Sequence, residues 1–376
     1  MIGGFLKRLW EGVRRALRVL TRPVRRSGGL KGTVIQPYRG YGTRQEVYLK
    51  GRVFRQPRFG QGLAPGSFLR ELSDLLRRLA RMGIADVQVT ASLGGAEASF
   101  VTDRHGYFEV ELAPKEPLPE DDRWHRVHLE VTRQGDTATA EGMVFVPSPS
   151  ACRLVVSDID DTVMFTGVAN VLRMFWRLFA QGAETRTAFP GVAALYRGLH
   201  GGPGGDEGNP LLYVSRAPWS IYEVLQTFFR MHDIPEGPVL FLREWGLTLQ
   251  HPLPRRSSGH KKEHIHAMLR RYPDLPVILI GDSGQHDPEI YAEIVHAHPG
   301  RVTAVYIRDV SDGDRARDID TLARETGTSG TELVLAEDSV VMADHALEAG
   351  FLTPDAREAV AQALEEHRQE TEAVSS

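Results

Sequence analysis

Hydrophobic and polar residues follow two different patterns along the chain, and the pattern changes near residue 150. Between residues 30 and 150, short runs alternate apolar with polar residues, as expected for strands that bury one face. These runs occupy residues 46–54, 85–93, 98–102, 107–112, 126–132 and 137–146. One helical pattern, at about 68–81, interrupts them. Short strands at this spacing predict a small β-sandwich.

After residue 150 the strands become continuously apolar. Such runs lie at 154–156, 211–214, 239–242, 277–280 and 302–307, and helical stretches separate them. This alternation predicts an α/β domain, in which a parallel sheet is covered by helices on both faces. We therefore expect a β-sandwich-like domain at 30–150, a linker at 147–150, an α/β domain at 151–335 and a C-terminal helical segment and tail at 336–376.

The first 29 residues are predicted to form a basic amphipathic helix. Residues 1–31 contain nine Lys or Arg and one acidic residue, a net charge of +8 that leaves −12 for the rest of the chain. Phe5, Leu9 and Trp10 belong to an apolar face at helical spacing, opposite an arginine-rich face. This combination favours a helix that lies in a membrane interface. The alternatives are a helix that packs on the body of the protein or a helix that binds a partner.

Composition narrows the class of protein and the cell compartment that suits it. The 376 residues are 41% hydrophobic and 25% charged, which is typical of a globular chain of about two domains. Cys152 is the only cysteine, so an internal disulfide framework is excluded and a reducing cytosol is suitable. No apolar run approaches the ~18 residues of a transmembrane helix. We expect a cytoplasmic protein, peripheral at the inner face of an anionic membrane through residues 1–29, with no nucleic-acid partner.

Acidic residues follow two of the predicted parallel strands directly. The first strand ends in Asp158-Ile159-Asp160-Asp161-Thr162, and the strand at 277–280 leads to Asp282 and Asp287. Side chains two residues apart on an extended segment point the same way, so Asp158 and Asp160 converge at the carboxyl end of the strand. Open α/β sheets bind their ligands at that edge. Carboxylates gathered there repel one another unless a cation lies between them, and oxygen ligands of this kind suit Mg²⁺.

Two further segments contribute candidate polar groups. The strand at 211–214 ends in Ser215, whose hydroxyl could hold a phosphoryl oxygen. The segment 257–266 begins a helix from which Lys261 or Lys262 could reach the same edge. His260 and His264, four residues apart on that helix, raise a zinc alternative, but no His-Glu-x-x-His motif accompanies them.

The four elements, in this order, resemble the signature of haloacid-dehalogenase-like phosphohydrolases: DxDxT, a strand ending in Ser, Lys at a helix start, and GDxxxxD. The strings SDIDDTV, YVSRAPW, HKKEHI, IGDSGQHDPEIY and VYIRDV also resemble the phosphatidate phosphatase family first described for actin-patch-associated yeast enzymes, especially its bacterial relatives. The resemblance covers about residues 30–335. It implies a haloacid-dehalogenase-like Rossmannoid sheet and phosphatidate or another phosphomonoester as substrate.

The resemblance also implies a role for each matching residue. Asp158 attacks the phosphorus and forms an aspartyl-phosphate, and Asp160 protonates the leaving alkoxide and then activates water. Ser215 and Lys261, the lysine of the family's His-Lys step, stabilise the phosphoryl oxygens. Thr162 fixes the loop. Mg²⁺ is held by Asp158, Asp282 and the backbone carbonyl of Asp160, with Asp287 in support.

Two rival functions remain open at this point. One keeps the chemistry but acts on a soluble phosphosugar, nucleotide or phosphoprotein, with residues 163–209 forming a small cap over the site. The other is a membrane-associated adaptor with an inactive phosphatase fold. The full set of acidic motif residues argues against the adaptor, because a scaffold does not need converging carboxylates.

Overall fold

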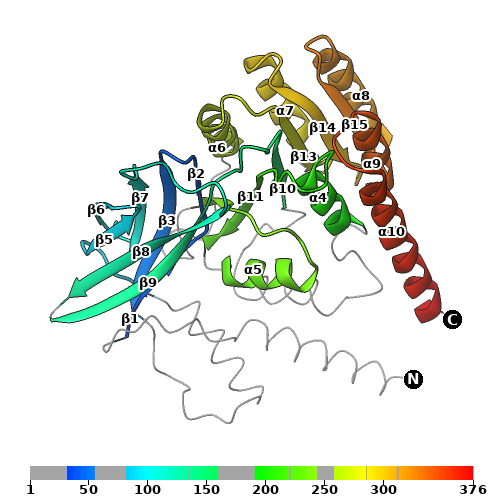
Figure 1. The fold of residues 1–376 in the computed structure, drawn as a ribbon. Helices are drawn as coiled ribbons and strands as arrows, with labels where there is room; N and C mark the ends of the chain where they lie inside the picture. Colours follow the sequence, from blue (N-terminus) through cyan, green and yellow to red (C-terminus); the bar gives the residue numbers. More distant parts are fainter. Residues whose placement is uncertain are drawn as a thin grey trace.

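The computed structural model describes residues 32–55, 82–133, 135–159, 191–219, 222–243, 258–284, 286–310 and 313–375, which form two modules (Figure 1). We call residues 33–145 the β-module and residues 154–375 the α/β module. The predicted helices at 1–29 and 68–81, and residues 163–190 of the predicted cap, lie outside the described residues. None of the described helices is both long and apolar enough to cross a membrane.

The β-module is a nine-stranded sheet in the described part of the chain. Its strands are β1 (Thr33–Pro37), β2 (Gly40–Gly42), β3 (Val47–Arg55), β4 (Met82–Gly83), β5 (Gln88–Leu93), β6 (Ala96–Val101), β7 (Tyr107–Leu112), β8 (Trp124–Arg133) and β9 (Asp136–Phe145). The order is β1-β3-β2-β9-β8-β5-β6, with β4 and β7 on the other edge of β3. All pairs are antiparallel except β2 with β9.

The two ends of this sheet share a single hydrophobic core. Leu49 of β3 and Val110 of β7 belong to the same buried cluster as Val89 of β5 and Leu129 of β8. The alternation seen in the sequence supplies this core, since residues on alternate positions of β3, β5 and β8 are buried. The expected sandwich is therefore formed by a continuous sheet that brings its own halves together around one core, rather than by two separate sheets.

In its described residues, the α/β module contains a six-stranded, wholly parallel sheet in the order β12-β11-β10-β13-β14-β15. Its strands are β10 (Leu154–Asp158), β11 (Leu211–Pro218), β12 (Val239–Arg243), β13 (Val277–Asp282), β14 (Val302–Arg308) and β15 (Glu332–Ala336). Five strands match the predicted apolar runs, whereas β15 has no counterpart among them. The strand order reverses between β10 and β13, and such a switch point is where doubly wound sheets bind ligands.

Helices cover both faces of the parallel sheet, as the apolar strands predict. They are α4 (Val192–Gly201), α5 (Tyr222–Met231), α6 (Ser258–Arg271), α7 (Asp287–Ala297), α8 (Gly313–Gly327), α9 (Ser339–Glu348) and α10 (Pro354–Ser375). One buried cluster joins α4, α5, α9 and α10 to the sheet, and a second joins α6, α7 and α8 to the opposite face. The C-terminal helices α9 and α10 thus complete a layer of the α/β module.

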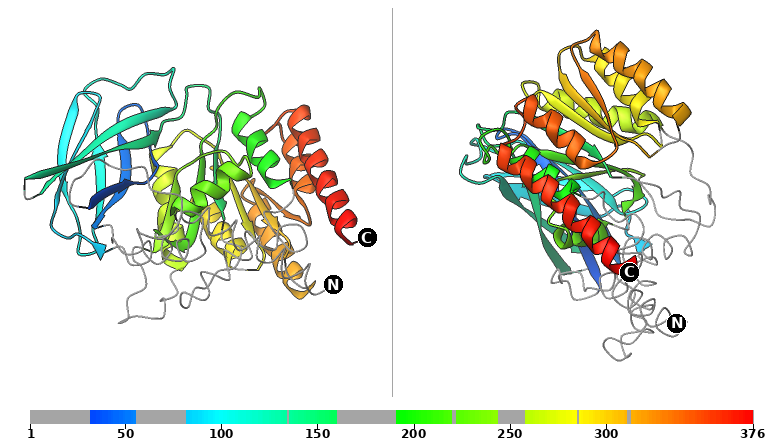
Figure 2. Two further views of the ribbon diagram at one scale, coloured as in Figure 1. Left: turned by 90° about the horizontal axis from the view of Figure 1, so that it is seen from below. Right: turned by 90° about the vertical axis from the view of Figure 1, so that its right-hand side faces the viewer.

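The β-module packs against one end of the α/β module, with α10 at the opposite end (Figure 2). Tyr38 stacks on Trp219, with ring centroids 4.1 Å apart. On the other side of the junction, the Tyr272 hydroxyl donates to the carbonyl oxygen of Gly42 at 3.1 Å. Tyr38 lies in one α/β core cluster and Tyr41 in the other. The two modules therefore share buried side chains on both faces of the parallel sheet.

Candidate active site

Two predicted acidic residues end the strands that flank the switch point. Asp158 is the last residue of β10, and Asp282 is the last residue of β13. The strands are paired in parallel, with Ser157 opposite Ile280, so both carboxyl ends open at the same edge. The apolar residues before each Asp bury the strand on both faces, which leaves its end as the place where polar side chains gather.

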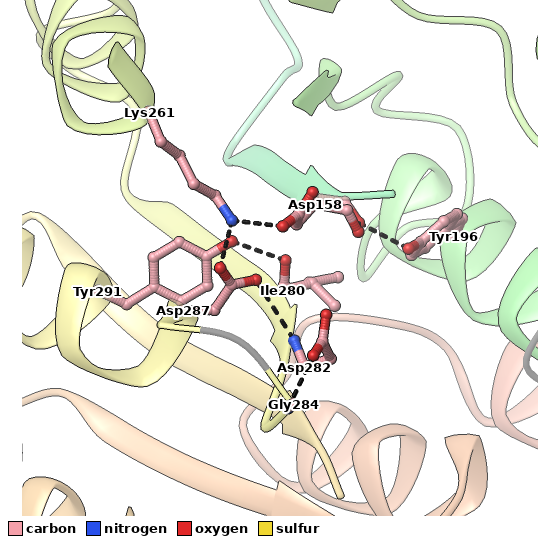
Figure 3. A network of polar contacts seen from close by, with 9 residues as sticks. Asp158, Tyr196, Lys261, Ile280, Asp282, Gly284, Asp287 and Tyr291 are labelled. Carbon is pink, nitrogen blue, oxygen red and sulfur yellow. Dashed lines mark hydrogen bonds and ion pairs between the residues drawn. The ribbon is translucent and has the colours of Figure 1, made fainter. Parts of the chain in front are cut away.

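Lys261 bridges two of the carboxylates from the first turns of α6 (Figure 3). Its Nζ donates to Asp158 Oδ2 and to Asp287 Oδ1, at 2.5 Å in each case. The side chains of Lys261, Asp158 and Asp287 are 1%, 2% and 0% exposed. Charged groups that are this deeply buried require partners. Lys262 instead lies toward the surface and pairs with Glu293.

Asp287 is the first residue of helix α7 and lies next to the end of β13. Its Oδ2 accepts from the backbone N–H of Asp282 at 3.4 Å. Gly281 makes this approach possible, because a Cβ at that position would lie 2.5 Å from Asp287 Oδ2 and 2.9 Å from the Tyr291 ring. The glycine of the Gly-Asp pair is therefore needed for space next to the carboxylate.

Burial and neighbouring charges shift the pKa values of Asp287 and Lys261. Burial, followed by the charge of Asp158, raises the pKa of Asp287 well above its ordinary value of 3.8. Burial alone would lower the pKa of Lys261, but the charges of Asp158 and Asp287 outweigh it and raise that pKa. The ammonium is accordingly held in its charged form, while Asp287 as a carboxylate is costly in the absence of a further cation.

The donor set fits a divalent metal ion. One oxygen from each of Asp158, Asp282 and Asp287 can be chosen so that all three lie within 4.8 Å of one another. These three carboxylates and the single Lys261 ammonium sum to −2. Hard oxygen ligands with an excess negative charge match what Mg²⁺ prefers. Among the described residues, no second cluster of at least three acidic, His or Cys side chains has ligand atoms close enough to hold a metal.

Two tyrosines that the sequence analysis gave no role complete the surroundings. Tyr291 presents its ring to Lys261, with Nζ 5.2 Å from the ring centroid, and its hydroxyl donates to the Ile280 carbonyl at 2.9 Å. Tyr196 of α4 lies 2.6 Å from the hydroxyl of Ser157, the residue before Asp158. Tyr291 stands four residues after Asp287 on one helix, a spacing that could have suggested a shared face.

The remaining predicted residues divide into two groups. Ser215 is buried and follows Val214, the residue paired with Asp158, so it lies at the same carboxyl edge on β11. Asp160 and Thr162 lie outside the described residues.

Known proteins resemble the part of the chain that carries this cluster. Residues 153–309 match the family model described as "Phosphatidate phosphatase APP1, catalytic domain". This range runs from β10 to β14 and contains every described residue of the cluster, but it leaves out the β-module.

Two curated fungal proteins match the same region. Phosphatidate phosphatase APP1 of Saccharomyces cerevisiae is 32% identical over 155 residues, which is 41% of this chain and 25% of that protein. An uncharacterized protein of Schizosaccharomyces pombe is 28% identical over 156 residues, 42% of this chain and 25% of that protein. The chain thus spans about a quarter of the length of each relative.

Among solved structures, a carbohydrate acetylesterase from Xanthomonas citri aligns with a TM-score of 0.26 and 11% identity, over 79% of this chain and 66% of that chain, which is too weak to bear on the fold. The informative similarity is therefore that of residues 153–309 to the catalytic domain of phosphatidate phosphatases.

Proposed function

We propose that this protein is a Mg²⁺-dependent phosphatidate phosphatase of the haloacid-dehalogenase-like superfamily, which hydrolyses phosphatidate to diacylglycerol and phosphate through an aspartyl-phosphate. One observation carries the proposal. Asp158, Lys261, Asp282 and Asp287 converge at the switch point of a parallel sheet, inside the region that matches a phosphatidate phosphatase catalytic domain.

In this proposal Asp158 is the nucleophile. One carboxylate oxygen attacks the phosphorus of the substrate, and the bond from phosphorus to the lipid oxygen breaks. Asp160 donates a proton to the leaving diacylglycerol oxygen. It then takes a proton from the water that attacks the aspartyl-phosphate, which releases phosphate and restores Asp158. The contact between Lys261 and Asp158 supports this assignment, because it fixes the carboxylate at the strand end where the phosphoryl group would bind.

The other site residues hold the phosphoryl group and the ion. Lys261, which lies between two carboxylates, and Ser215, at the neighbouring strand end, are assigned to stabilise the phosphoryl oxygens. Thr162 is assigned to fix the loop after Asp160. Asp158, Asp282, Asp287 and the Asp160 carbonyl would bind Mg²⁺. A bound ion supplies charge neutralisation on the phosphoryl oxygens.

Residues 1–29 are proposed to bring this site to an anionic membrane surface on the cytoplasmic side. Their net positive charge and apolar helical face support this role, since both features strengthen interfacial binding. A lipid substrate stays in the bilayer, so an enzyme that acts on it gains from binding the same surface.

The test is phosphate release by wild type and by Asp158→Asn, each with Mg²⁺ or EDTA. The substrates are phosphatidate in mixed micelles and a panel of soluble phosphomonoesters. We expect activity on phosphatidate that is lost in the variant and with EDTA. Asp158→Asn is chosen because the amide keeps the shape of the side chain but is a poor nucleophile.

Other outcomes would change the conclusion in defined ways. Activity on a soluble ester alone would keep the chemistry and reject the lipid substrate. Activity that survives Asp158→Asn would reject the aspartyl-phosphate mechanism. A wild type that releases no phosphate from any substrate would reject the enzyme and favour an adaptor.

A further inference from the structure

The β-module contacts the segment that follows Ser215. Trp219 comes directly after β11 and stacks on Tyr38 of the β-module at 4.1 Å. Tyr222, at the start of α5, meets the same Tyr38 ring edge-on at 4.8 Å. All three rings are buried, with Tyr38 only 2% exposed. Burying and stacking large aromatic rings gives a junction considerable rigidity.

Polar contacts reinforce this aromatic cluster. The backbone N–H of Arg39 donates to the Tyr222 hydroxyl at 2.8 Å. The Arg39 guanidinium donates to Gln226 of α5 and forms an ion pair with Glu236. Lys50 of β3 places its ammonium 5.7 Å from the Trp219 ring centroid. Tyr38 and Arg39 therefore hold both the end of β11 and the helix that follows it.

The end of β11, which Tyr38 and Arg39 hold, has an irregular strand pairing next to the candidate site. The pairing of β11 with β12 shifts register between Ser215 and Pro218. A bulge of this kind breaks the ladder and changes where the neighbouring side chains point. On one side, Val214 is fixed by its pairing with Asp158. On the other side, Trp219 is buried and stacks on Tyr38.

We infer that Tyr38 and Arg39 are positioning residues for the phosphatase site, acting through Trp219 on the segment that carries Ser215. The inference rests on the proposed function, because that function gives Ser215 its contact with the phosphoryl group. Both residues lie outside residues 153–309, the range matched by the catalytic-domain model. The β-module is thus a working part of the catalytic unit, not an independent binding domain.

The test compares Tyr38→Ala, which removes the ring, with Tyr38→Phe, which keeps it. Leu129→Ala is the matched control, because it opens a cavity in the β-module core away from this junction. Each variant is assayed well below its melting temperature with p-nitrophenyl phosphate and Mg²⁺. Hydrogen exchange of the peptide covering residues 211–222 is followed in parallel, and this measurement does not depend on activity.

We expect Tyr38→Ala to lower kcat/KM about ten- to a hundredfold, mostly through kcat, because small displacements of a phosphoryl-binding group are costly in the transition state. Amides of residues 211–222 exchange faster in the same variant. Tyr38→Phe restores kcat to within about threefold of wild type. Leu129→Ala lowers the melting temperature but leaves kcat, KM and the exchange of residues 211–222 unchanged.

Several results would overturn the inference. Wild-type kinetics in folded Tyr38→Ala, unchanged exchange at 211–222, or an equal loss in Leu129→Ala would each do so. If Tyr38→Ala does not fold, Tyr222→Phe takes its place, since it keeps the ring and removes only the acceptor of the Arg39 N–H. If wild type has no phosphatase activity, the proposed function fails. The exchange data alone then decide whether the β-module supports this segment.

Discussion

Replacing Lys261 by Met is expected to destabilise the metal-free protein strongly, because it leaves two buried carboxylates facing each other. The substitution keeps an apolar stem as long as the lysine side chain up to Cε, and it removes the ammonium with its charge and its N–H donors. Asp158 and Asp287 would each lose a contact of 2.5 Å, and both side chains are at most 2% exposed. Neither carboxylate can recover that interaction from water without opening the site.

The expected loss of stability follows from the burial of these side chains. Removing one partner of a buried ion pair costs about 3–5 kcal/mol, because an uncompensated charge stays inside the protein. For a domain of about 150–250 residues, 1 kcal/mol shifts the melting temperature by roughly 2–4 °C. Lys261→Met is therefore expected to melt roughly 6–20 °C below wild type.

The assay is thermal unfolding followed by circular dichroism in EDTA, and the chain supplies its own control. Lys262→Met removes the neighbouring lysine, which pairs with Glu293 near the surface, and such pairs contribute about 0–1 kcal/mol. Mg²⁺ should raise the melting temperature of Lys261→Met by more than that of wild type. The variant leaves three carboxylates without their ammonium, and a cation relieves their repulsion.

The double variant Lys261→Met with Asp287→Asn separates charge from packing. It removes the charge of Asp287 together with that of Lys261, so the double variant should be more stable than Lys261→Met alone. Equal melting temperatures for Lys261→Met and Lys262→Met would refute the buried bridge. A double variant no more stable than the single one would show that the loss comes from packing.

Three further predictions concern the metal, the pH and the membrane. Mg²⁺ at about 100 times its Kd should raise the unfolding free energy of wild type by about 2.7 kcal/mol. Gly281→Ala should displace Asp287 and so weaken Mg²⁺ binding at least about tenfold. Calorimetry measures both effects. A carboxyl whose pKa is raised on folding contributes stability below its unfolded pKa and loses it as the pH rises through the folded value. In EDTA, urea unfolding should therefore show that the unfolding free energy of Asp287→Asn increases relative to that of wild type as the pH rises from about 4. A difference between the two free energies that stays constant with pH would contradict this. Deleting residues 1–29 should weaken cosedimentation with anionic liposomes and spare turnover of a soluble ester; unchanged cosedimentation would reject the anchor.

Much of the fold could be predicted because the local pattern of the chain reflects burial directly. Continuous apolar runs marked β10, β11, β12, β13 and β14, since strands buried on both faces need no polar positions. Alternating runs marked most strands of the β-module. The short strands β1, β2 and β4 and the outer strand β15 were missed. In β15 the first four residues are not fully buried, so its apolar signal is weaker.

The candidate site was predictable as far as the strand ends. Asp158 and Asp282 follow apolar strands, and parallel strands place such residues at one edge whatever the rest of the fold does. Helix spacing alone did not distinguish the two lysines. Lys261 lies four residues before buried Ile265 and seven before buried Met268, but Lys262 lies three residues before Ile265 and seven before buried Leu269.

The residue types, their order and the edge at which the acidic groups gather can thus be read from the amino-acid sequence. Three features depend on long-range contacts: β10 lies beside β13, Lys261 reaches Asp158 and Asp287 together, and Tyr38 packs on Trp219. These contacts join residues far apart in the chain. Their formation depends on strand order and on how the modules dock, and a local pattern of polar and apolar residues encodes burial but not the identity of the partner.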